Sequence, residues 1–290
     1  MIETAKRIGR KYSLPISKQL VGSWKHQYAQ HFPYFRMRED IASQTPPHEL
    51  ILDTRLHHGQ VYDYRYHRGK TNHLLASDKN GAAYHRMQAY LEGVPTDTPH
   101  DLFRRDAARA SQTKTPFSLN EVAITPRQNK AIDMARFVLQ TVSNNYQRHP
   151  KLQSFMLEND AVTIAVEVPI VLTHKDLAHY QHKLGFRIPL ALPEDAAITG
   201  HIDILQIRNG AIQILDYKPN AKKDKPVEQL MIYALALSRL TLIPLYSFKC
   251  AWFDDEHYFE FYPLNVVHKK QNASKYAAKQ PPIEPDLTIV

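Results

Sequence analysis

The chain has 290 residues, of which 43% are hydrophobic and 23% are charged, so it can build a sizeable core and general disorder is excluded. No apolar run approaches the roughly 18 residues that a membrane-spanning helix requires, and the first residues lack the apolar stretch of a secretory signal peptide. We therefore expect a cytoplasmic protein without a membrane partner.

The charge balance is 37 Lys and Arg against 29 Asp and Glu, a formal net charge of +8. Such an excess is typical of proteins that bind nucleic acid, although a basic enzyme without an anionic partner would have the same balance. The single cysteine, Cys250, excludes an internal disulfide, a cysteine-based zinc site and an iron–sulfur cluster. A reducing compartment such as the cytoplasm suits this composition.

Two strands are predicted near the N-terminus, over Glu49–Leu56 and Val61–Arg68, around a short loop. Because side chains alternate along a strand, Tyr62, Tyr64 and Tyr66 share one face of the second strand. A row of tyrosines beside arginines can stack on bases, and it can equally pack against the core. The pattern leaves both readings open.

The next elements are predicted to be helices. Ala82–Glu92 has a helical pattern that Gly93 would end. Thr125–Gln128 has the pattern of a capping box with proline at the first helical position, so a second helix is expected to begin there and to end near Asn145. Apolar residues at helical spacing in this second helix indicate core packing.

From residue 161 the hydrophobic period changes from helix to strand, and Glu167 falls on the less apolar face of the first strand of this region. The remaining predicted elements are two strands over Ile198–Arg208 and Ala211–Lys218, a helix over Asp224–Leu240, and a closing hairpin of Phe248–Phe253 and His257–Tyr262. Residues after 265 are expected to form a poorly ordered tail.

Asn209-Gly210 lies between two strand patterns and is the strongest short hairpin signal, because both turn positions favour positive φ. A two-residue loop pairs Arg208 with Ala211, and each further pair follows in register. Asp203 is then predicted to lie directly opposite Asp216, with Cβ atoms roughly 4.5–5.5 Å apart.

Two carboxylates at this separation repel each other unless a positive charge lies between them. A divalent ion with oxygen ligands, Mg²⁺ or Mn²⁺, fits this position. Lys218 points to the same face as Asp216, and two acids with a lysine suit a metal-activated water that attacks a phosphodiester. The alternative is a solvent-exposed hairpin face with a compensating lysine, and a one-residue bulge would break the predicted register.

Several short motifs occur in a fixed order along the chain. They are Gly81-Ala82-Ala83-Tyr84-His85, Glu167, Gly200-x-x-Asp203, Asp216-Tyr217-Lys218 and Gln229-x-x-x-Tyr233. Together they resemble the PD-(D/E)XK nuclease superfamily, and within it the RecB-type exonuclease branch. The resemblance covers about residues 80–240. The four-cysteine iron–sulfur subtype of that branch is excluded, and Pro219 stands where a small hydroxyl residue is common.

The resemblance implies a role for each motif residue. Asp203, Asp216, His85 and the backbone carbonyl of Tyr217 would bind the metal. Glu167 would act beside the metal, and Lys218 would orient the attacking water and stabilise the transition state.

Substrate contacts are expected from other residues. Gln229 and Tyr233, one helical turn apart, would reach the site or the substrate phosphate. Arg104 and Arg105 either contact phosphate or form a solvated surface.

The implied fold is α/β, with a restriction-endonuclease-like core in which helices flank a central mixed β-sheet. The expected division is an N-terminal β-hairpin and helical extension over residues 1–80, a nuclease core over 81–265 and a flexible tail over 266–290. The implied activity is metal-dependent hydrolysis of DNA by an exonuclease or single-strand-preferring enzyme. The alternatives are a non-catalytic nucleic-acid-binding module and a subunit of a nucleic-acid-processing complex, and an oligomer or complex partner is compatible with each.

Overall fold

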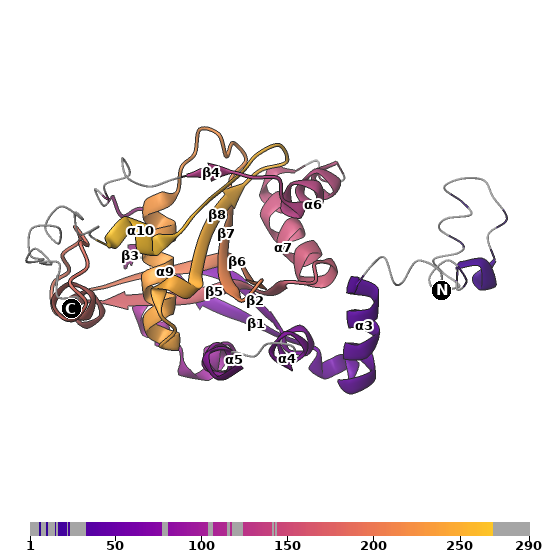
Figure 1. Cartoon of the computed structure of the whole chain (residues 1–290), viewed down its shortest axis with the longest axis horizontal. Helices are drawn as coiled ribbons and strands as arrows, with labels where there is room; N and C mark the ends of the chain where they lie inside the picture. The colour runs from indigo at the N-terminus through magenta and orange to yellow at the C-terminus, as the bar shows by residue number, and fades with distance from the viewer. Residues whose placement is uncertain are drawn as a thin grey trace, which may run out of the picture.

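The computed structural model describes residues 33–76, 81–103, 107–114, 124–140 and 144–268, with a few isolated positions besides. Among these residues, nine strands form one sheet (Figure 1) in the order β1-β2-β5-β6-β7-β8-β9-β4, and β3 pairs with β6 off this path. The β7–β8 and β3–β6 pairs are parallel, and the others are antiparallel. The sheet is therefore mixed, as the sequence predicts.

The strands are β1 (Ile51–His58), β2 (Gln60–His67), β3 (Ala108–Arg109), β4 (Thr125–Pro126), β5 (Thr163–Thr173), β6 (Ala197–Arg208), β7 (Ala211–Tyr217), β8 (Phe248–Phe253) and β9 (Tyr258–Phe261). The helices are α3 (Pro33–Gln44), α4 (Arg68–Ala76), α5 (Gly81–Asp97), α6 (Lys130–Leu139), α7 (Arg148–Asn159), α8 (His174–Ala178), α9 (Val227–Thr241) and α10 (Pro263–Val267). The predictions for the strands of the central hairpin, β8 and α9 are confirmed to within a few residues.

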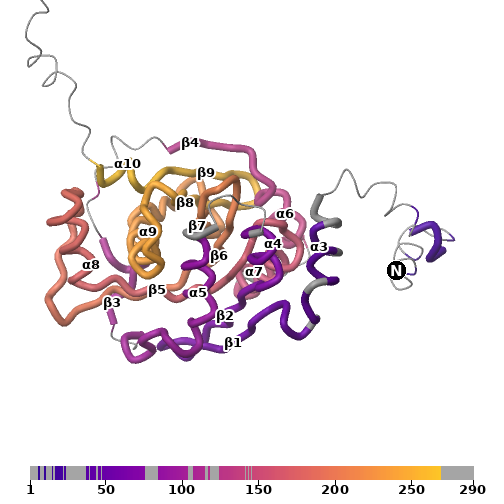
Figure 2. The backbone as a smooth tube through the Cα atoms, turned by 60° about the horizontal axis from the view of Figure 1, so that its bottom comes forward, coloured from indigo at the N-terminus to yellow at the C-terminus, as the bar shows by residue number. Residues whose placement is uncertain are grey.

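Helices cover both faces of the central strands (Figures 1 and 2). On one side, α5 and α9 contribute to the larger buried cluster, with Leu91, Leu230 and Leu237 among its fully buried residues. On the other side, α6 and α7 form a second cluster that includes Ala135 and Leu152. Because both faces are covered, strands β5 to β8 are almost entirely buried.

The β1–β2 hairpin belongs to this same sheet, since β2 pairs with β5. Tyr64 and Tyr66 are fully buried, whereas Tyr62 is half-buried, so two of the three tyrosines pack in the core. A buried lysine joins the segment after the hairpin to the chain before β5: the Lys70 ammonium donates to the carbonyls of Asp160 (2.6 Å) and Thr163 (3.3 Å), and also to that of Leu157. Burial lowers the pKa of Lys70 to about 7.

Gly93 does not end α5, which was the sequence prediction, because the helix continues to Asp97 with Pro95 in its last turns. Proline has no N–H to donate to the carbonyl four residues earlier, that of Leu91. The Tyr64 hydroxyl donates to this carbonyl at 2.7 Å. A side chain from β2 therefore replaces the hydrogen bond that Pro95 cannot make.

The capping box predicted at Thr125–Gln128 is also wrong. Thr125 and Pro126 instead form β4, and Thr125 pairs with Glu260 of β9. The following helix, α6, is capped by Asn129, whose side chain accepts from the backbone N–H of Ala131 at 3.0 Å. Strand pairing with β9 thus outweighs the local capping signal.

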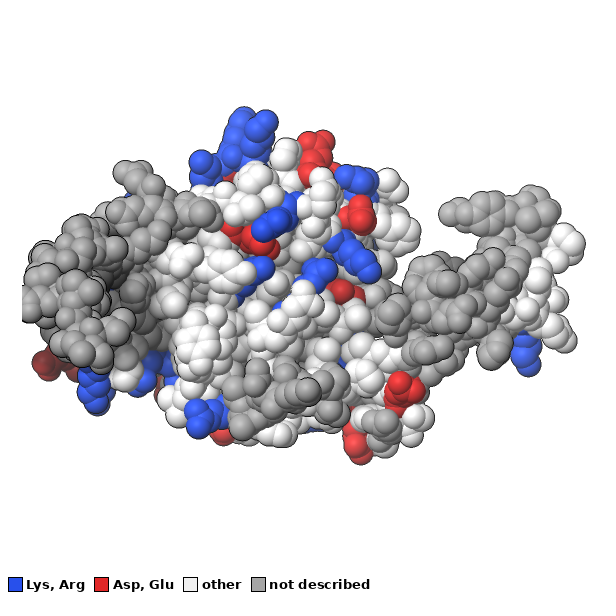
Figure 3. Space-filling model, in the orientation of Figure 1, with Lys and Arg blue, Asp and Glu red and all other residues white. Residues whose placement is uncertain are grey.

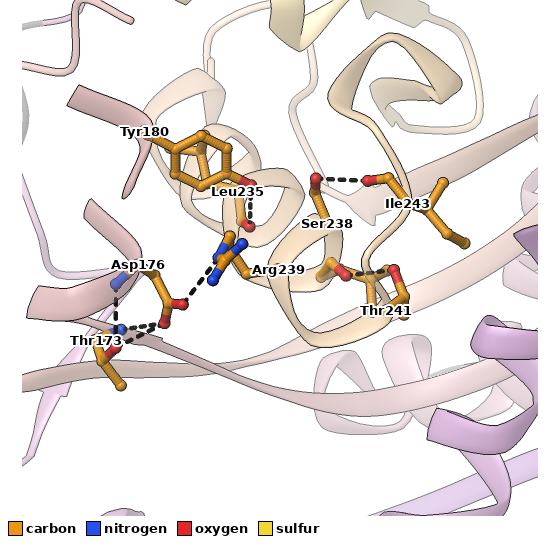
Figure 4. A network of polar contacts seen from close by, with 9 residues as sticks. Thr173, Asp176, Tyr180, Leu235, Ser238, Arg239, Thr241 and Ile243 are labelled. Atoms are coloured by element: carbon orange, nitrogen blue, oxygen red, sulfur yellow. Dashed lines mark hydrogen bonds and ion pairs between the residues drawn. The ribbon is translucent and has the colours of Figure 1, made fainter. Parts of the chain in front are cut away.

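The C-terminal end of α9 is fixed by a network of polar contacts (Figure 4). Arg239 pairs with Asp176 at 3.1 Å, and Asp176 in turn forms a capping box with Thr173 at the start of α8. Ser238 donates to the carbonyl of Ile243 at 2.6 Å, which closes the turn after the helix. These contacts hold α9 against β5, and the opposite end of α9 reaches the site described next.

Residues 269–290, the predicted tail, lie outside the described residues, as do Arg104 and Arg105. No helix in the described part of the chain has the length and apolar character to span a membrane.

Candidate active site

Three acidic residues lie side by side on three adjacent strands. The pairs Val166–Ile204 and Val168–Ile202 place Glu167 of β5 across from Asp203 of β6. On the other side of β6, the two-residue turn sets the register with β7, and the pairs run from Arg208–Ala211 to Ile204–Leu215. The next pair of positions in this register is Asp203 and Asp216. Asn209 and Gly210 have φ of 51° and 72°, which confirms the predicted two-residue turn and its register.

The backbone at Glu167 is unusual for a strand, because its φ is +52°. A non-glycine residue in this region carries strain on the order of 1–3 kcal/mol, and such residues occur often at functional sites. The alternation of side chains between the two faces of the sheet is interrupted here. Val166 packs in the cluster with α6 and α7, whereas Val168, two residues later, packs in the cluster with α5 and α9. The kink is thus located at the acid itself, and the alternating sequence pattern gave no sign of it.

Asp216 lacks ordinary hydrogen-bond partners. Only 1% of its surface is exposed, and neither carboxylate oxygen accepts a hydrogen bond from any residue that the structure describes. It forms an ion pair with the Lys218 ammonium, which lies 2.8 Å from Oδ2. Asp203 differs, because its Oδ2 accepts from the backbone N–H of Tyr217 at 3.2 Å. Buried carboxylate oxygens without partners are costly unless a cation satisfies them.

The acids strongly influence each other's protonation. Burial, followed by the nearby Asp203, raises the pKa of Glu167 to about 8 and that of Asp216 to about 7. Burial would also raise the pKa of Asp203, but the nearby His149, followed by Lys218, outweighs burial and lowers that pKa. Lys218 keeps its charge, because Asp216 outweighs burial and raises the lysine pKa. Without a metal ion, Glu167 is therefore mostly protonated at neutral pH, whereas Asp216 titrates in this range and Asp203 is ionised.

Helix α7 supplies two residues that the sequence analysis missed. His149 Nδ1 lies 3.6 Å from Asp203 Oδ2, and its pKa is raised because Asp203 outweighs burial. Gln153, one turn later, donates to Glu167 at 2.7 Å. The sequence signal was Pro150, which favours the first turn of a helix and could have shown that a helix begins here.

Gln229 and Tyr233 of α9 also reach the acids, as predicted from their spacing. The Gln229 amide donates to the Tyr233 hydroxyl at 2.8 Å, and both side chains line a cavity of about 160 Å³ together with Glu167 and Asp203. Tyr233 fits there because Gly200 has no side chain: a Cβ at this position would lie 2.6 Å from the tyrosine ring. The Gly200-x-x-Asp203 motif thus has a steric reason for its glycine.

The structure does not bring His85 to this cluster. The side chain is exposed on α5, and its neighbours in the helix point elsewhere: Tyr84 donates to the carbonyl of Gly210 at the β6–β7 turn, and Arg86 to that of Leu242. Its predicted role as a ligand has no geometric support. His149 occupies the position beside Asp203 instead.

The donor set suits a hard divalent cation. No group of three or more His, Cys, Asp or Glu side chains in the described residues is arranged to hold a metal ion alone. Mg²⁺, however, keeps several waters and commonly binds through one or two carboxylates and the phosphate of its substrate. The unpartnered oxygens of Asp216 beside Asp203 meet that requirement.

Five further residues line the same cavity: Tyr62, Arg109, His58, His201 and Phe103. Of these, only Tyr62 was singled out from the sequence, as part of a row of tyrosines that can stack on bases or pack against the core. The five residues come from β2, β3, the end of β1, β6 and the segment after α5. Arg109 reaches the site because β3 pairs in parallel with β6, Arg109 beside Thr199. Two-residue strands of this kind have no detectable sequence pattern.

A comparison with protein-family models matches residues 48–255, more than half of the chain, to the PD-(D/E)XK nuclease superfamily. No curated protein and no solved structure matches the chain. The matched region includes all three acids, Lys218 and both α9 residues, and with the helix-flanked mixed sheet it confirms the predicted restriction-endonuclease-like core. It does not distinguish the RecB-type branch, which stays a prediction. The chain therefore belongs to the PD-(D/E)XK nuclease superfamily.

Proposed function

We propose that the protein is a divalent-metal-dependent nuclease that hydrolyses DNA phosphodiester bonds, as an exonuclease or a single-strand-preferring enzyme. The observation that carries the proposal is the row of Glu167, Asp203 and Asp216 on adjacent strands, with the Lys218 ammonium 2.8 Å from Asp216. Burying three acids beside one lysine lowers the free energy of unfolding, so a functional role is expected for them. The same groups can bind a cation and stabilise the charge that develops in phosphoryl transfer.

In this proposal, Asp203 and Asp216 bind Mg²⁺ or Mn²⁺ together with the backbone carbonyl of Tyr217. When bound, the ion supplies positive charge that favours deprotonation of the attacking water and offsets the charge of the phosphate. His149 holds the Asp203 carboxylate in its charged form and in position. Asp203 is thus held by His149 and by the backbone N–H of Tyr217, whereas Asp216 is balanced by Lys218.

Lys218 provides the second positive charge. It stays protonated beside Asp216, so it can orient the attacking water and stabilise the charge that develops on the phosphate. Glu167 lies across from Asp203 on the next strand, beside the proposed metal ligands, where it can bind the ion directly or through water. Gln229 and Tyr233 line the same cavity and offer donors to the substrate phosphate.

The second candidate is a nucleic-acid-binding module or a subunit of a processing complex, without turnover. The net charge of +8 is compatible with it. In the view of Figure 3, the Lys and Arg side chains of the described residues are scattered with acidic residues between them. The intact set of three acids and a lysine therefore favours catalysis over binding alone.

A digestion panel tests the proposal. Purified protein is incubated with single-stranded, double-stranded and circular DNA and with RNA, with and without Mn²⁺ or Mg²⁺, and Lys218→Ala serves as the control. We expect metal-dependent digestion of linear DNA by the wild type and none by the variant. Equal digestion by both proteins would assign the activity to a contaminant, and binding without digestion in any metal would support the second candidate.

A further inference from the structure

The cavity beside the acids is lined by two chemically different sets of residues. One set is Glu167 and Asp203, where the proposed metal would bind. The other set, here called the ring wall, contains Arg109 and the ring of Tyr62, which stacks on His201. A ligand in this space would therefore meet carboxylates, or their bound cation, as well as a guanidinium and flat rings.

Arg109 is available to bind an anion. The salt bridges among the described residues do not include it. The guanidinium lies close to the hydroxyl of Tyr62: burial raises the pKa of this phenol, and Arg109 acts against the increase. The tyrosine thus keeps its proton at neutral pH, so both residues present hydrogen-bond donors to the same part of the cavity.

The ring wall is flat and held in place. Tyr62 stacks on His201, with ring centroids 3.6 Å apart and planes 10° apart, and Phe103 stacks on His58 at 3.9 Å and 18°. A hydrogen bond of 2.8 Å between His58 and His201 joins the two stacked pairs, and a second bond of 2.7 Å ties His58 to His100. Such preordered rings bind bases by stacking with little sequence preference.

The size of the cavity limits what can enter. Its volume is about 160 Å³, and a cavity on the order of 150 Å³ holds a benzene ring. One base fits this space, whereas a base pair, with twice the ring area, does not. The sugar and phosphate of that nucleotide would extend from the cavity past Arg109, so charge and size together suit one unpaired nucleotide.

We infer that this cavity, here called the Arg109 pocket, binds one unpaired nucleotide of the substrate strand. Arg109 and Tyr62 donate to its phosphate, and the rings of the wall contact its base. The inference rests on the proposed nuclease function and extends it, because it gives a structural reason for acting on strand ends or single strands. It predicts that a fully paired substrate must fray before it can enter.

The test measures binding separately from cleavage. Fluorescence anisotropy in EDTA follows a labelled single-stranded DNA and a blunt hairpin of the same composition. The variants are Arg109→Ala, Arg109→Lys and Tyr62→Phe, which keeps the stacking ring. Arg127→Ala is the matched control, since Arg127 is an arginine that pairs with Glu260 on the β4–β9 edge.

We expect Arg109→Ala to weaken single-strand binding about 10- to 100-fold, which is the usual cost of losing a charge-assisted hydrogen bond. Arg109→Lys should recover part of this loss, and Tyr62→Phe should weaken binding about threefold. Hairpin binding should change less than threefold in each variant, and Arg127→Ala should change neither substrate by more than about twofold. Equal losses for single strand and hairpin, or no loss in Arg109→Ala, would overturn the inference.

Cleavage of the same two substrates in Mn²⁺ separates the possible failures. If the wild type binds single strands through Arg109 but cleaves nothing, the nuclease function fails and the pocket stands. If the wild type cleaves both substrates and Arg109→Ala binds and cleaves them as well as the wild type does, the pocket fails and the nuclease function stands. Melting curves of each variant confirm that the compared proteins are folded.

Discussion

Helix α9 contacts two polar clusters that differ in how fully their buried polar groups are hydrogen-bonded. At its C-terminal end, Arg239, Asp176 and Thr173 satisfy one another through an ion pair and a capping box (Figure 4). At its N-terminal half, Tyr233 faces a row of three acids in which Asp216 forms an ion pair with Lys218 but accepts no hydrogen bond from the described residues. The first cluster is satisfied by its own contacts, whereas the second keeps an excess of acids over cations and is stabilised further when a cation binds.

This difference separates stability from function within one helix. Buried polar groups that are fully paired fix a structure, while unpaired ones raise its free energy and mark sites for ligands or chemistry. Substitutions in the C-terminal cluster should therefore reduce the free energy of unfolding and spare activity. Substitutions in the acid row should do the reverse.

The largest expected effect is on cleavage. Lys218→Ala and Asp216→Ala should each lower the rate at least 10²- to 10³-fold, because each removes charge that acts in the transition state. Asp216→Ala should not lower the melting temperature of the metal-free protein, because it also removes repulsion from Asp203. Lys218→Ala should lower it, because the buried Asp216 carboxylate loses its ion pair, but the variant should remain folded at the temperature of the assay. Rate and melting measurements on the same preparations check this pair of outcomes. Cleavage above a few per cent of the wild-type rate in either variant would contradict the assignment.

The next effect is stabilisation by metal. Binding to the folded state alone adds about 2.7 kcal/mol at a hundredfold excess over Kd, which corresponds to a rise in Tm of roughly 5–10 °C. We expect Mn²⁺ to raise Tm at fixed ionic strength, and Asp203→Asn to reduce this rise more than Glu167→Gln does. Equal shifts for wild type and Asp203→Asn would mean that the paired-aspartate site does not bind the ion.

The satisfied cluster should respond in the opposite way. Arg239→Ala removes the partner of the half-buried Asp176, so we expect a loss of about 2 kcal/mol in the free energy of unfolding and cleavage within about twofold of the wild type. Arg55→Ala is the control: its ion pair with Asp63 is 67% and 62% exposed, and it should cost less than about 0.5 kcal/mol. Denaturant unfolding and initial rates measure both quantities.

The sequence predicted the part of the site that local rules determine. The Asn209-Gly210 turn fixes the register of β6 and β7, and this register brings Asp203 and Asp216 together. The relative position of the two aspartates could therefore be predicted from the turn dipeptide. The spacing of Gln229 and Tyr233 similarly placed both on one face of a helix.

The rest of the site depends on contacts that no local pattern encodes. His149 approaches Asp203 because α7 packs across the sheet, and Arg109 reaches the pocket through a two-residue strand. The positive φ of Glu167 lies within a paired strand, and the alternating sequence pattern contains no signal for it. The predicted helix start at Thr125 failed for the same reason, since pairing with β9 is a tertiary effect. His85 has the right motif position and the wrong helix face.

The smallest expected effect is on the pH dependence of stability. The pKa of Glu167 is raised to about 8 in the folded protein, well above the value of 4.5 expected for the unfolded chain. Between these values the folded state binds more protons than the unfolded state, so this acid makes the free energy of unfolding fall as pH rises.

Other buried groups act in the opposite direction, because burial lowers the pKa of His58 to about 4 and that of Lys70 to about 7. The difference between Glu167→Gln and the wild type cancels their contributions. In EDTA, this difference should increase in favour of the variant by about 1.4 kcal/mol between pH 6 and pH 7, which is the value of one proton per pH unit. Asp63→Asn, at an exposed acid, should show no such increase. If the difference between Glu167→Gln and the wild type stayed constant over this range, Glu167 would be ionised in the metal-free protein. The contrast between the satisfied and the unsatisfied ends of α9 would then be confined to Asp216.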